Sequence, residues 1–158
     1  MNAQLIARIK ALGVIPAPFY TYAYYHGEKW SEYGEEKMEH MFTHRSYIDA
    51  GIPVAPASDF TPGPYEPMMA LQSMVTRKDR AGRVWGPSQR ITVEEALRVC
   101  TVNGAYASFE EDRKGSLTPG KLADCVLLGA DPHDTDPDRL VDIGIVRTIL
   151  GGKTVHAA

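Results

Sequence analysis

The sequence has few cysteines, no long apolar run and no excess of positive charge, and each absence excludes a class of protein. Only Cys100 and Cys125 occur among 158 residues, without a Cys-x-x-Cys pair, so we expect two reduced, buried thiols rather than a zinc site or a disulfide framework. A formal net charge of −3 gives no basic footprint for nucleic acid. No apolar stretch approaches the roughly 20 residues of a membrane helix, and none resembles a signal peptide. We therefore expect a cytoplasmic protein without a membrane partner.

The most informative stretch is the short apolar run 52–57, which ends in Ser58 and Asp59. Such a run, preceded by Gly51, is typical of a strand that is buried on both faces of a parallel sheet. In α/β barrels the groups at the carboxyl ends of these strands face the active site, which makes Asp59 a candidate catalytic carboxylate. The alternative is that the Ser-Asp pair closes a turn with its own side chains.

The first half of the chain predicts two βα units of a parallel sheet behind a leading helix. The expected order is a helix over 2–12 ended by Gly13, a strand over 14–18, an aromatic loop over 19–33, a helix over 35–50, the strand over 52–57 and a helix that begins near Pro67. Two parallel strands cannot close a barrel or cover their own edges. We therefore expect that further structure is needed to complete this sheet.

The second half predicts a helix and then antiparallel strands. Thr92 and Glu95 have the spacing of a capping box, which opens a helix. Residues 125–128 read as a strand, and Gly151-Gly152 is a two-residue hairpin turn between strands over 145–150 and 153–156. This pattern indicates a small second sheet appended to the parallel part.

Several segments together resemble the amidohydrolase superfamily, and most closely its amidohydrolase-3 branch, which includes the N-substituted formamide deformylases. They are Arg45-Ser46-Tyr47-Ile48-Asp49-Ala50-Gly51, Ser58-Asp59, Arg90-Ile91-Thr92-Val93-Glu94-Glu95-Ala96-Leu97, the run from Gly115 to Asp124 and the closing Gly151-Gly152-Lys153. The resemblance implies an α/β fold. Residues 1–114 would form the C-terminal part of a metal-dependent hydrolase (β/α)8 barrel, with strands seven and eight at 14–18 and 52–57. Residues 115–158 would form C-terminal strands of an appended β-sandwich.

The resemblance also implies an activity, which is metal-dependent hydrolysis of non-peptide C–N bonds in small amide-type substrates. By this resemblance Asp59 is a ligand of the divalent metal, with zinc as the expected ion, and the base that accepts a proton from the attacking water. The family's His-x-His pair is absent, and a complete barrel needs about 250 residues. We therefore expect the chain alone to bind no metal and to be inactive. Its partner is then either an N-terminal portion or a second copy, and the alternative function is a non-catalytic, self-associating remnant of the fold.

The remaining candidates lie in the aromatic segment and on the helix that follows it. His26 and Tyr24 are candidates for substrate binding at the mouth of the first strand, although these aromatic side chains could equally pack the loop onto the rest of a barrel. His40 and His44 have the i,i+4 spacing of metal ligands. The zincin pattern requires Glu after the first His, and Met41 stands there, so we expect a solvent-exposed helix face. The sequence contains no Gly-x-Ser-x-Gly nucleophile elbow, so it does not indicate a serine hydrolase.

Overall fold

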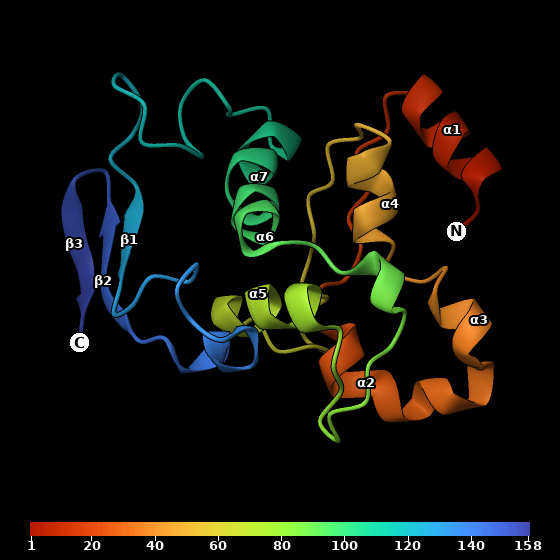
Figure 1. The fold of residues 1–158 in the computed structure, drawn as a ribbon. Helices are drawn as coiled ribbons and strands as arrows, with labels where there is room; N and C mark the ends of the chain where they lie inside the picture. Colours follow the sequence, from red (N-terminus) through yellow and green to blue (C-terminus); the bar gives the residue numbers. More distant parts are fainter.

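The computed structural model describes residues 1–158 and places short helices at one end of the molecule and a three-stranded sheet at the other (Figure 1). In chain order the elements are α1 (Ala3–Ala11), α2 (Tyr22–Trp30), η1 (Ser31–Tyr33), α3 (Glu35–Met38), α4 (His44–Asp49), α5 (Pro67–Thr76), η2 (Pro87–Gln89), α6 (Val93–Cys100), α7 (Val102–Ala107), β1 (Cys125–Leu128), η3 (Pro137–Asp142), β2 (Ile145–Leu150) and β3 (Lys153–Ala157). None of the helices combines the length and hydrophobicity that crossing a bilayer requires.

Helices α1, α5 and α6 begin where the local sequence predicts. The Asn2 side chain accepts a hydrogen bond from the Leu5 amide at 2.9 Å, and Gly13 follows the helix with a φ of +64°. Pro67 opens α5, as the fixed φ of proline favours. The capping box of Thr92 and Glu95 is present at the start of α6.

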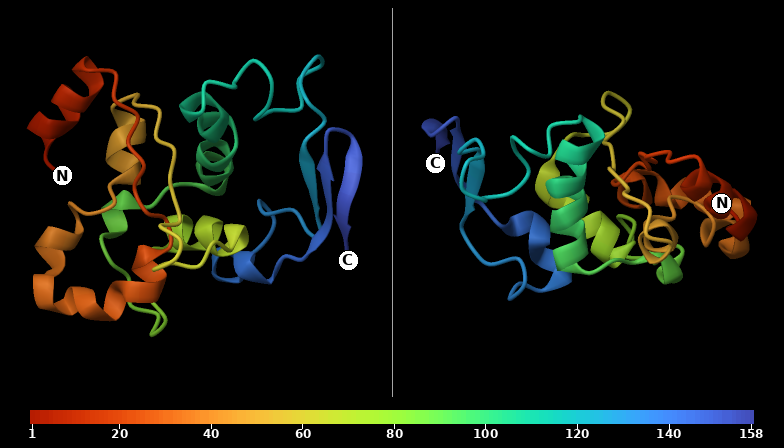
Figure 2. Two further views of the ribbon diagram at one scale, coloured as in Figure 1. Left: turned by 180° about the vertical axis from the view of Figure 1, so that it is seen from behind. Right: turned by 90° about the horizontal axis from the view of Figure 1, so that it is seen from above.

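The two segments predicted as strands, 14–18 and 52–57, are extended and run side by side in parallel (Figure 2). The hydrogen bonds that join them run from Ala55 N to Pro16 O (3.0 Å), from Ala57 N to Pro18 O (3.1 Å) and from Tyr20 N to Ala57 O (3.1 Å). Only Phe19 and Ala57 form a parallel bridge, so neither segment is a regular strand. Their place in a barrel stays a prediction.

Prolines explain why this pairing is sparse. Pro16 and Pro18 turn their carbonyl groups toward the neighbouring segment, yet neither has an N–H to donate there. In the other segment Pro53, Ala55 and Ala57 alternate along the chain, so their backbone groups face the same side, and Pro53 has no N–H either. The shared edge therefore lacks three of the donors of a parallel ladder, those of Pro16, Pro18 and Pro53, which is why the expectation of two regular strands is not met.

The expected aromatic loop over 19–33 is wrong, because most of it is helix α2 followed by the 3-10 turn η1. One face of α2 is buried at Ala23, Gly27 and Trp30, which have helical spacing. Gly27 allows a close approach: a Cβ there would lie 2.5 Å from the Cβ of Asp79 and 2.8 Å from Nε1 of Trp85. Tertiary packing thus makes a helix of a segment whose aromatic composition suggested a loop.

The single helix expected over 35–50 is also wrong, since it is divided into α3 and α4. Phe42 between them has a φ of +50°, which a continuous α-helix does not allow. His40 is exposed and precedes this break, whereas His44 opens α4 and is only 1% exposed. The two histidines therefore share no helix face, and the expectation of solvent exposure fails for His44.

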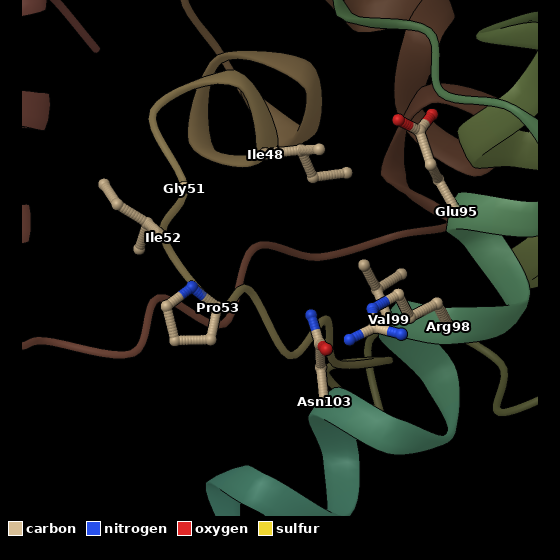
Figure 3. Close-up of a pocket in the computed structure, with 8 residues that line it drawn as sticks. All are labelled: Ile48, Gly51, Ile52, Pro53, Glu95, Arg98, Val99 and Asn103. Atoms are coloured by element: carbon tan, nitrogen blue, oxygen red, sulfur yellow. The ribbon is translucent and has the colours of Figure 1, made fainter. Parts of the chain in front are cut away.

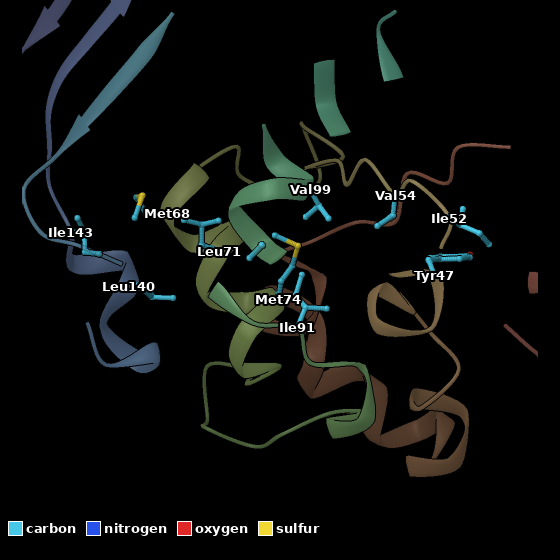
Figure 4. Packing of buried hydrophobic residues seen from close by; sticks show 11 residues of the cluster. Tyr47, Ile52, Val54, Met68, Leu71, Met74, Ile91, Val99, Leu140 and Ile143 are labelled. Carbon is cyan, nitrogen blue, oxygen red and sulfur yellow. The ribbon is translucent and has the colours of Figure 1, made fainter. Parts of the chain in front are cut away.

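The main core is formed by α4, the 52–57 segment, α5, α6 and the region of η3 (Figure 4). Its buried members are Tyr47, Ile52, Val54, Met68, Leu71, Met74, Ile91, Ala96, Val99, Leu140 and Ile143. A smaller cluster contains Ala23, Trp30, Met38 and Trp85. Because Leu140 and Ile143 belong to the main core, residues beyond 114 pack directly on the first part of the chain; the division at 114 stays a prediction.

The C-terminal strands form an antiparallel sheet in the order β1-β2-β3, as the sequence predicted. Gly151 and Gly152 have φ values of +56° and +78°, which fit the type I′ hairpin turn between β2 and β3. Cys125 begins β1 and is half-buried, while Cys100 at the end of α6 is exposed. Both thiols are free as expected, but the expectation that both are buried is wrong.

Candidate active site

Asp59 lies directly beyond the paired segment 52–57, half-buried, with a φ of +56°. This left-handed conformation is uncommon for a residue with a side chain, and such outliers often occur at functional sites. Ser58 Oγ accepts a hydrogen bond from the Phe60 amide at 3.2 Å, and the Asp59 carbonyl accepts one from the Gly63 amide at 3.1 Å. The turn alternative thus describes Ser58 correctly, whereas the Asp59 carboxylate is not used to close the turn.

The Asp59 carboxylate instead accepts a hydrogen bond from the hydroxyl of Tyr22, through Oδ2. Tyr22 opens α2, just beyond the other paired segment, so the bond connects the carboxyl ends of both segments. The hydrogen bond to Asp59, burial and the negative charge of Asp59 together raise the pKa of Tyr22. Tyr22 therefore remains a neutral donor to the carboxylate. We did not predict Tyr22 as a site residue; its i,i+4 spacing to His26 was the available signal, and the loop interpretation concealed it.

Three aromatic rings surround the ring of Tyr22. Its centroid lies 4.8 Å from Phe19, 4.7 Å from His26 and 5.4 Å from Phe42. The His26 contact is edge-on, at an interplanar angle of 65°. The two predicted residues Asp59 and His26 therefore both contact Tyr22, the carboxylate through the hydroxyl and the imidazole through the ring.

His26 is half-buried, and its electrostatic surroundings disfavour its protonated form. Burial, and then the positive charges of Lys29 and Arg80, lower the pKa of His26 below its ordinary value. The imidazole is therefore neutral at pH 7, with one nitrogen able to donate and the other able to accept a hydrogen bond.

Tyr24, the other predicted substrate contact, lies in a different group of side chains. Its ring packs edge-on against Tyr25 at 5.0 Å, and the Arg80 guanidinium lies over both rings, 5.9 Å from Tyr24 and 4.9 Å from Tyr25. The Tyr25 hydroxyl donates to Glu66 at 2.7 Å. Tyr24 is thus separated from the contacts that join Asp59, Tyr22 and His26.

The chain contains no group of three or more His, Cys, Asp or Glu side chains that could hold a metal ion. A catalytic zinc ordinarily takes three protein ligands and keeps an open position. Asp59 is a single carboxylate, and one of its oxygens is already hydrogen-bonded to Tyr22. Residues 1–158 therefore do not by themselves fit a divalent metal.

A cavity of about 300 Å³ lies at the other end of the 52–57 segment. Residues from α4, the start of this segment, α6 and α7 line it: Ile48, Gly51, Ile52, Pro53, Glu95, Arg98, Val99 and Asn103 (Figure 3). Glu95 is ion-paired with Arg45, and the Asn103 amide donates to the Val54 carbonyl at 2.9 Å. The cavity is therefore separate from Asp59, and the one carboxylate in its lining, that of Glu95, is already paired with Arg45.

Comparison with known proteins identifies the family. The model of the amidohydrolase family matches residues 1–156. Over 128 residues the chain is 36% identical to the N-substituted formamide deformylase of Arthrobacter pascens, covering 80% of this chain and 24% of that protein. It is 34% identical over 114 residues to the imidazolonepropionase of Kosmotoga olearia, covering 70% of this chain and 25% of that protein. The chain thus spans about a quarter of the length of these relatives.

A solved structure supports the same conclusion for the fold. An uncharacterized metal-dependent hydrolase from Pyrococcus horikoshii superimposes with a TM-score of 0.74 over 87% of this chain and 28% of its own, at 21% sequence identity. At this identity the likeness establishes a shared fold and nothing further. Together with the family match, it confirms the resemblance seen in the sequence. The chain belongs to the amidohydrolase family and corresponds to the C-terminal part of its amidohydrolase-3 branch.

Proposed function

We propose that these residues form part of a metal-dependent hydrolase of non-peptide C–N bonds in small amide-type substrates, and that Asp59 is its proton-accepting carboxylate. The observation that carries the proposal is the position of Asp59, which projects from the carboxyl end of two parallel segments and is held by Tyr22. The relatives support this reaction class, since the Arthrobacter pascens protein is named as a formamide deformylase.

Hydrolysis of an amide requires a base that takes a proton from the attacking water and an acid that returns it to the departing amine. A single carboxylate performs both steps when it reaches the water and the leaving nitrogen. Asp59 Oδ2 accepts from Tyr22, which leaves Oδ1 to receive the proton of the water. We assign neutral His26, whose ring contacts that of Tyr22, as a hydrogen-bond partner of the substrate, and we keep Tyr24 as a more distant substrate contact.

The remainder of the site lies outside residues 1–158 in this proposal. Residues 1–114 contribute barrel strands seven and eight with Asp59, and residues 115–158 contribute strands of the appended sandwich. The divalent metal, with zinc as the expected ion, needs donors that this chain lacks, because only one carboxylate is present where several ligands are required. Asp59 supplies one ligand to that metal.

The proposal is tested by joining residues 1–158 to the other three quarters of the Arthrobacter pascens deformylase, in place of its matching quarter. The joined protein is expected to hydrolyse an N-substituted formamide. Asp59→Asn keeps the shape but removes the base, and turnover should fall at least about a hundredfold. Asp49→Asn, on the exposed end of α4, is the matched control and should leave turnover unchanged. Activity of Asp59→Asn within about threefold of the parent would remove Asp59 from the mechanism.

One observation favours the second candidate, a remnant that associates with itself. In segment 14–19 the backbone groups of Ile15, Ala17 and Phe19 make no backbone hydrogen bond and face away from the 52–57 segment. Leu5 on α1 and Leu12, which follows this helix, are exposed, at 47% and 68%. An open edge beside apolar surface promotes pairing with another chain.

Light scattering during size exclusion separates the free chain's possible states. We expect a dimer or larger assembly at low micromolar concentration, with more than about 1,000 Å² buried in total. Ala17→Pro places a ring on the open edge and should weaken the assembly, because proline cannot donate to an added strand. A cooperative monomer of the parent chain would show that this edge needs no partner.

A further inference from the structure

The Asp59 carboxylate makes a single hydrogen bond to another side chain, and its partner comes from the neighbouring segment. The Tyr22 hydroxyl donates to Oδ2 of Asp59 across the carboxyl ends of segments 14–19 and 52–57. The backbone at Asp59, with a φ of +56°, aims the side chain but leaves the carboxylate free to rotate. Tyr22 is therefore the group that fixes the orientation of this carboxylate.

The ring of Tyr22 is itself held in place by packing. Phe19 from the end of the first segment, His26 from the next turn of α2 and Phe42 from the α3–α4 connection contact it with centroid distances between 4.7 and 5.4 Å. Aromatic neighbours at these distances restrict a ring to one orientation. The hydroxyl is thus presented to Asp59 from a rigid support, as functional groups generally require.

A donor bound to one oxygen of a carboxylate determines where the other oxygen points. When Oδ2 is held by Tyr22, Oδ1 is the oxygen available to the attacking water or to another partner. Without the hydroxyl the carboxylate would sample several rotations, and only some would be productive.

We propose that Tyr22 is a positioning residue of the active site, whose hydroxyl orients the Asp59 carboxylate for proton transfer. The inference rests on the proposed function and adds a residue to it. Tyr22 does not itself contact the reacting atoms in this role.

The first test uses the joined protein described above. Tyr22→Phe keeps the ring within its aromatic surroundings and removes only the hydroxyl, so kcat should fall about 10- to 100-fold, as for other groups that orient a reacting side chain. KM should change less than about twofold, because substrate contacts are retained. Tyr25→Phe removes the hydroxyl that donates to Glu66 and is the matched control, with kcat unchanged. In an Asp59→Asn background Tyr22→Phe should have little further effect, because both changes disable the same step.

The second test uses the free chain and no activity. Tyrosine bands in the Raman spectrum report whether a phenol donates a strong hydrogen bond. The difference spectrum between the parent chain and Tyr22→Phe should show a strong donor, and this signature should disappear when both chains also carry Asp59→Ala. Circular dichroism establishes that each variant is folded.

These experiments distinguish a failure of the positioning role of Tyr22 from a failure of the proposed function. An active joined protein in which Tyr22→Phe turns over like the parent would refute the positioning role and leave the proposed function standing. A folded joined protein without activity would refute the proposed function and this inference with it. A Raman difference unaffected by Asp59→Ala would show that Tyr22 does not bind Asp59.

Discussion

Arg77 is a buried charge that connects three parts of the fold without a carboxylate partner. It is 2% exposed, follows α5 in the left-handed conformation, and donates only to backbone carbonyl groups. The bonds run from Nε to Trp85 O (2.8 Å), from Nη1 to Phe42 O (3.2 Å), and from Nη2 to Met41 O (3.2 Å) and Met38 O (3.4 Å). Burial lowers the pKa of Arg77 to about 10, so the guanidinium stays charged at pH 7.

Arg77→Lys should therefore destabilise the chain although it conserves charge. An ammonium cannot reproduce the planar fork, and some of the carbonyl groups would be left without a donor. We expect a loss of about 3 kcal/mol in the free energy of unfolding, measured by urea denaturation. Arg98→Lys on the exposed face of α6 is the control and should change stability by less than about 0.5 kcal/mol. Equal stabilities of the two variants would contradict the role assigned to Arg77.

His44 should make the stability depend on pH. Burial, and then the nearby charge of Arg77, lower the pKa of His44 to about 3, although a hydrogen bond to the Phe42 carbonyl opposes the shift. An unfolded chain protonates this residue near pH 6.5, so between the two values it binds more protons than the folded chain. The contribution is present above about pH 6.5 and lost as pH falls, by up to about 1.4 kcal/mol per pH unit.

Urea denaturation near pH 7 and near pH 5 measures this dependence. His44→Gln should flatten it, because no proton uptake then distinguishes the unfolded chain. The exposed residue His40 provides the control, and His40→Gln should keep the dependence of the parent. An unchanged slope in His44→Gln would mean that other groups cause the acid sensitivity.

At the scale of residues, the sequence indicated Asp59 because an apolar run that ends in a carboxylate places it at a strand end. The same reasoning missed Tyr22, since a tyrosine in a presumed loop has no defined direction. His44 was misplaced because its burial depends on the break at Phe42, which is set by contacts with Arg77 far along the chain.

At the scale of elements, two helical glycines differ only in their surroundings. A Cβ on Gly27 in α2 would meet Asp79 and Trp85, whereas one on Gly104 in α7 would have no heavy atom within 4 Å. Gly104→Ala should therefore raise the free energy of unfolding by about 0.5–1 kcal/mol, because alanine favours helix. Gly27→Ala should lower it by about 1–3 kcal/mol, because the site is already full.

Thermal or urea denaturation of both variants gives the comparison directly. A stabilised Gly27→Ala chain would show that α2 does not pack against Trp85 as the structure has it. The pair also separates intrinsic helix preference from packing, since the chemical change is the same in both.

Elements whose ends carry local signals were predictable from the sequence. These signals act on backbone groups within a few residues of themselves, so the local sequence is enough to predict the element. They are the caps Asn2 and Thr92, the first-turn residue Pro67 and the Gly151-Gly152 turn. Helix α2 and the division between α3 and α4 depend on contacts with residues 77–85, which no local pattern contains.

At the scale of the whole molecule, the two parallel segments 14–19 and 52–57 do not form a complete sheet on their own. Prolines leave them few donors for each other, and the edge of segment 14–19 is open. The Asp59 carboxylate lies at the carboxyl ends of these segments and accepts a hydrogen bond from Tyr22. Family resemblance supplied the barrel interpretation, because composition and periodicity could show only that the sheet was incomplete.

In the proposed function this chain supplies one carboxylate, that of Asp59, to a metal site that other residues complete. Zinc titration by calorimetry, on the free chain and on the joined protein, tests this division of the site. We predict no saturable zinc binding by the free chain, because a zinc site ordinarily needs about three protein ligands. The joined protein should bind zinc, and Asp59→Ala should weaken that binding. Tight stoichiometric binding by the free chain, abolished by Asp59→Ala, would show that residues 1–158 hold a complete zinc site.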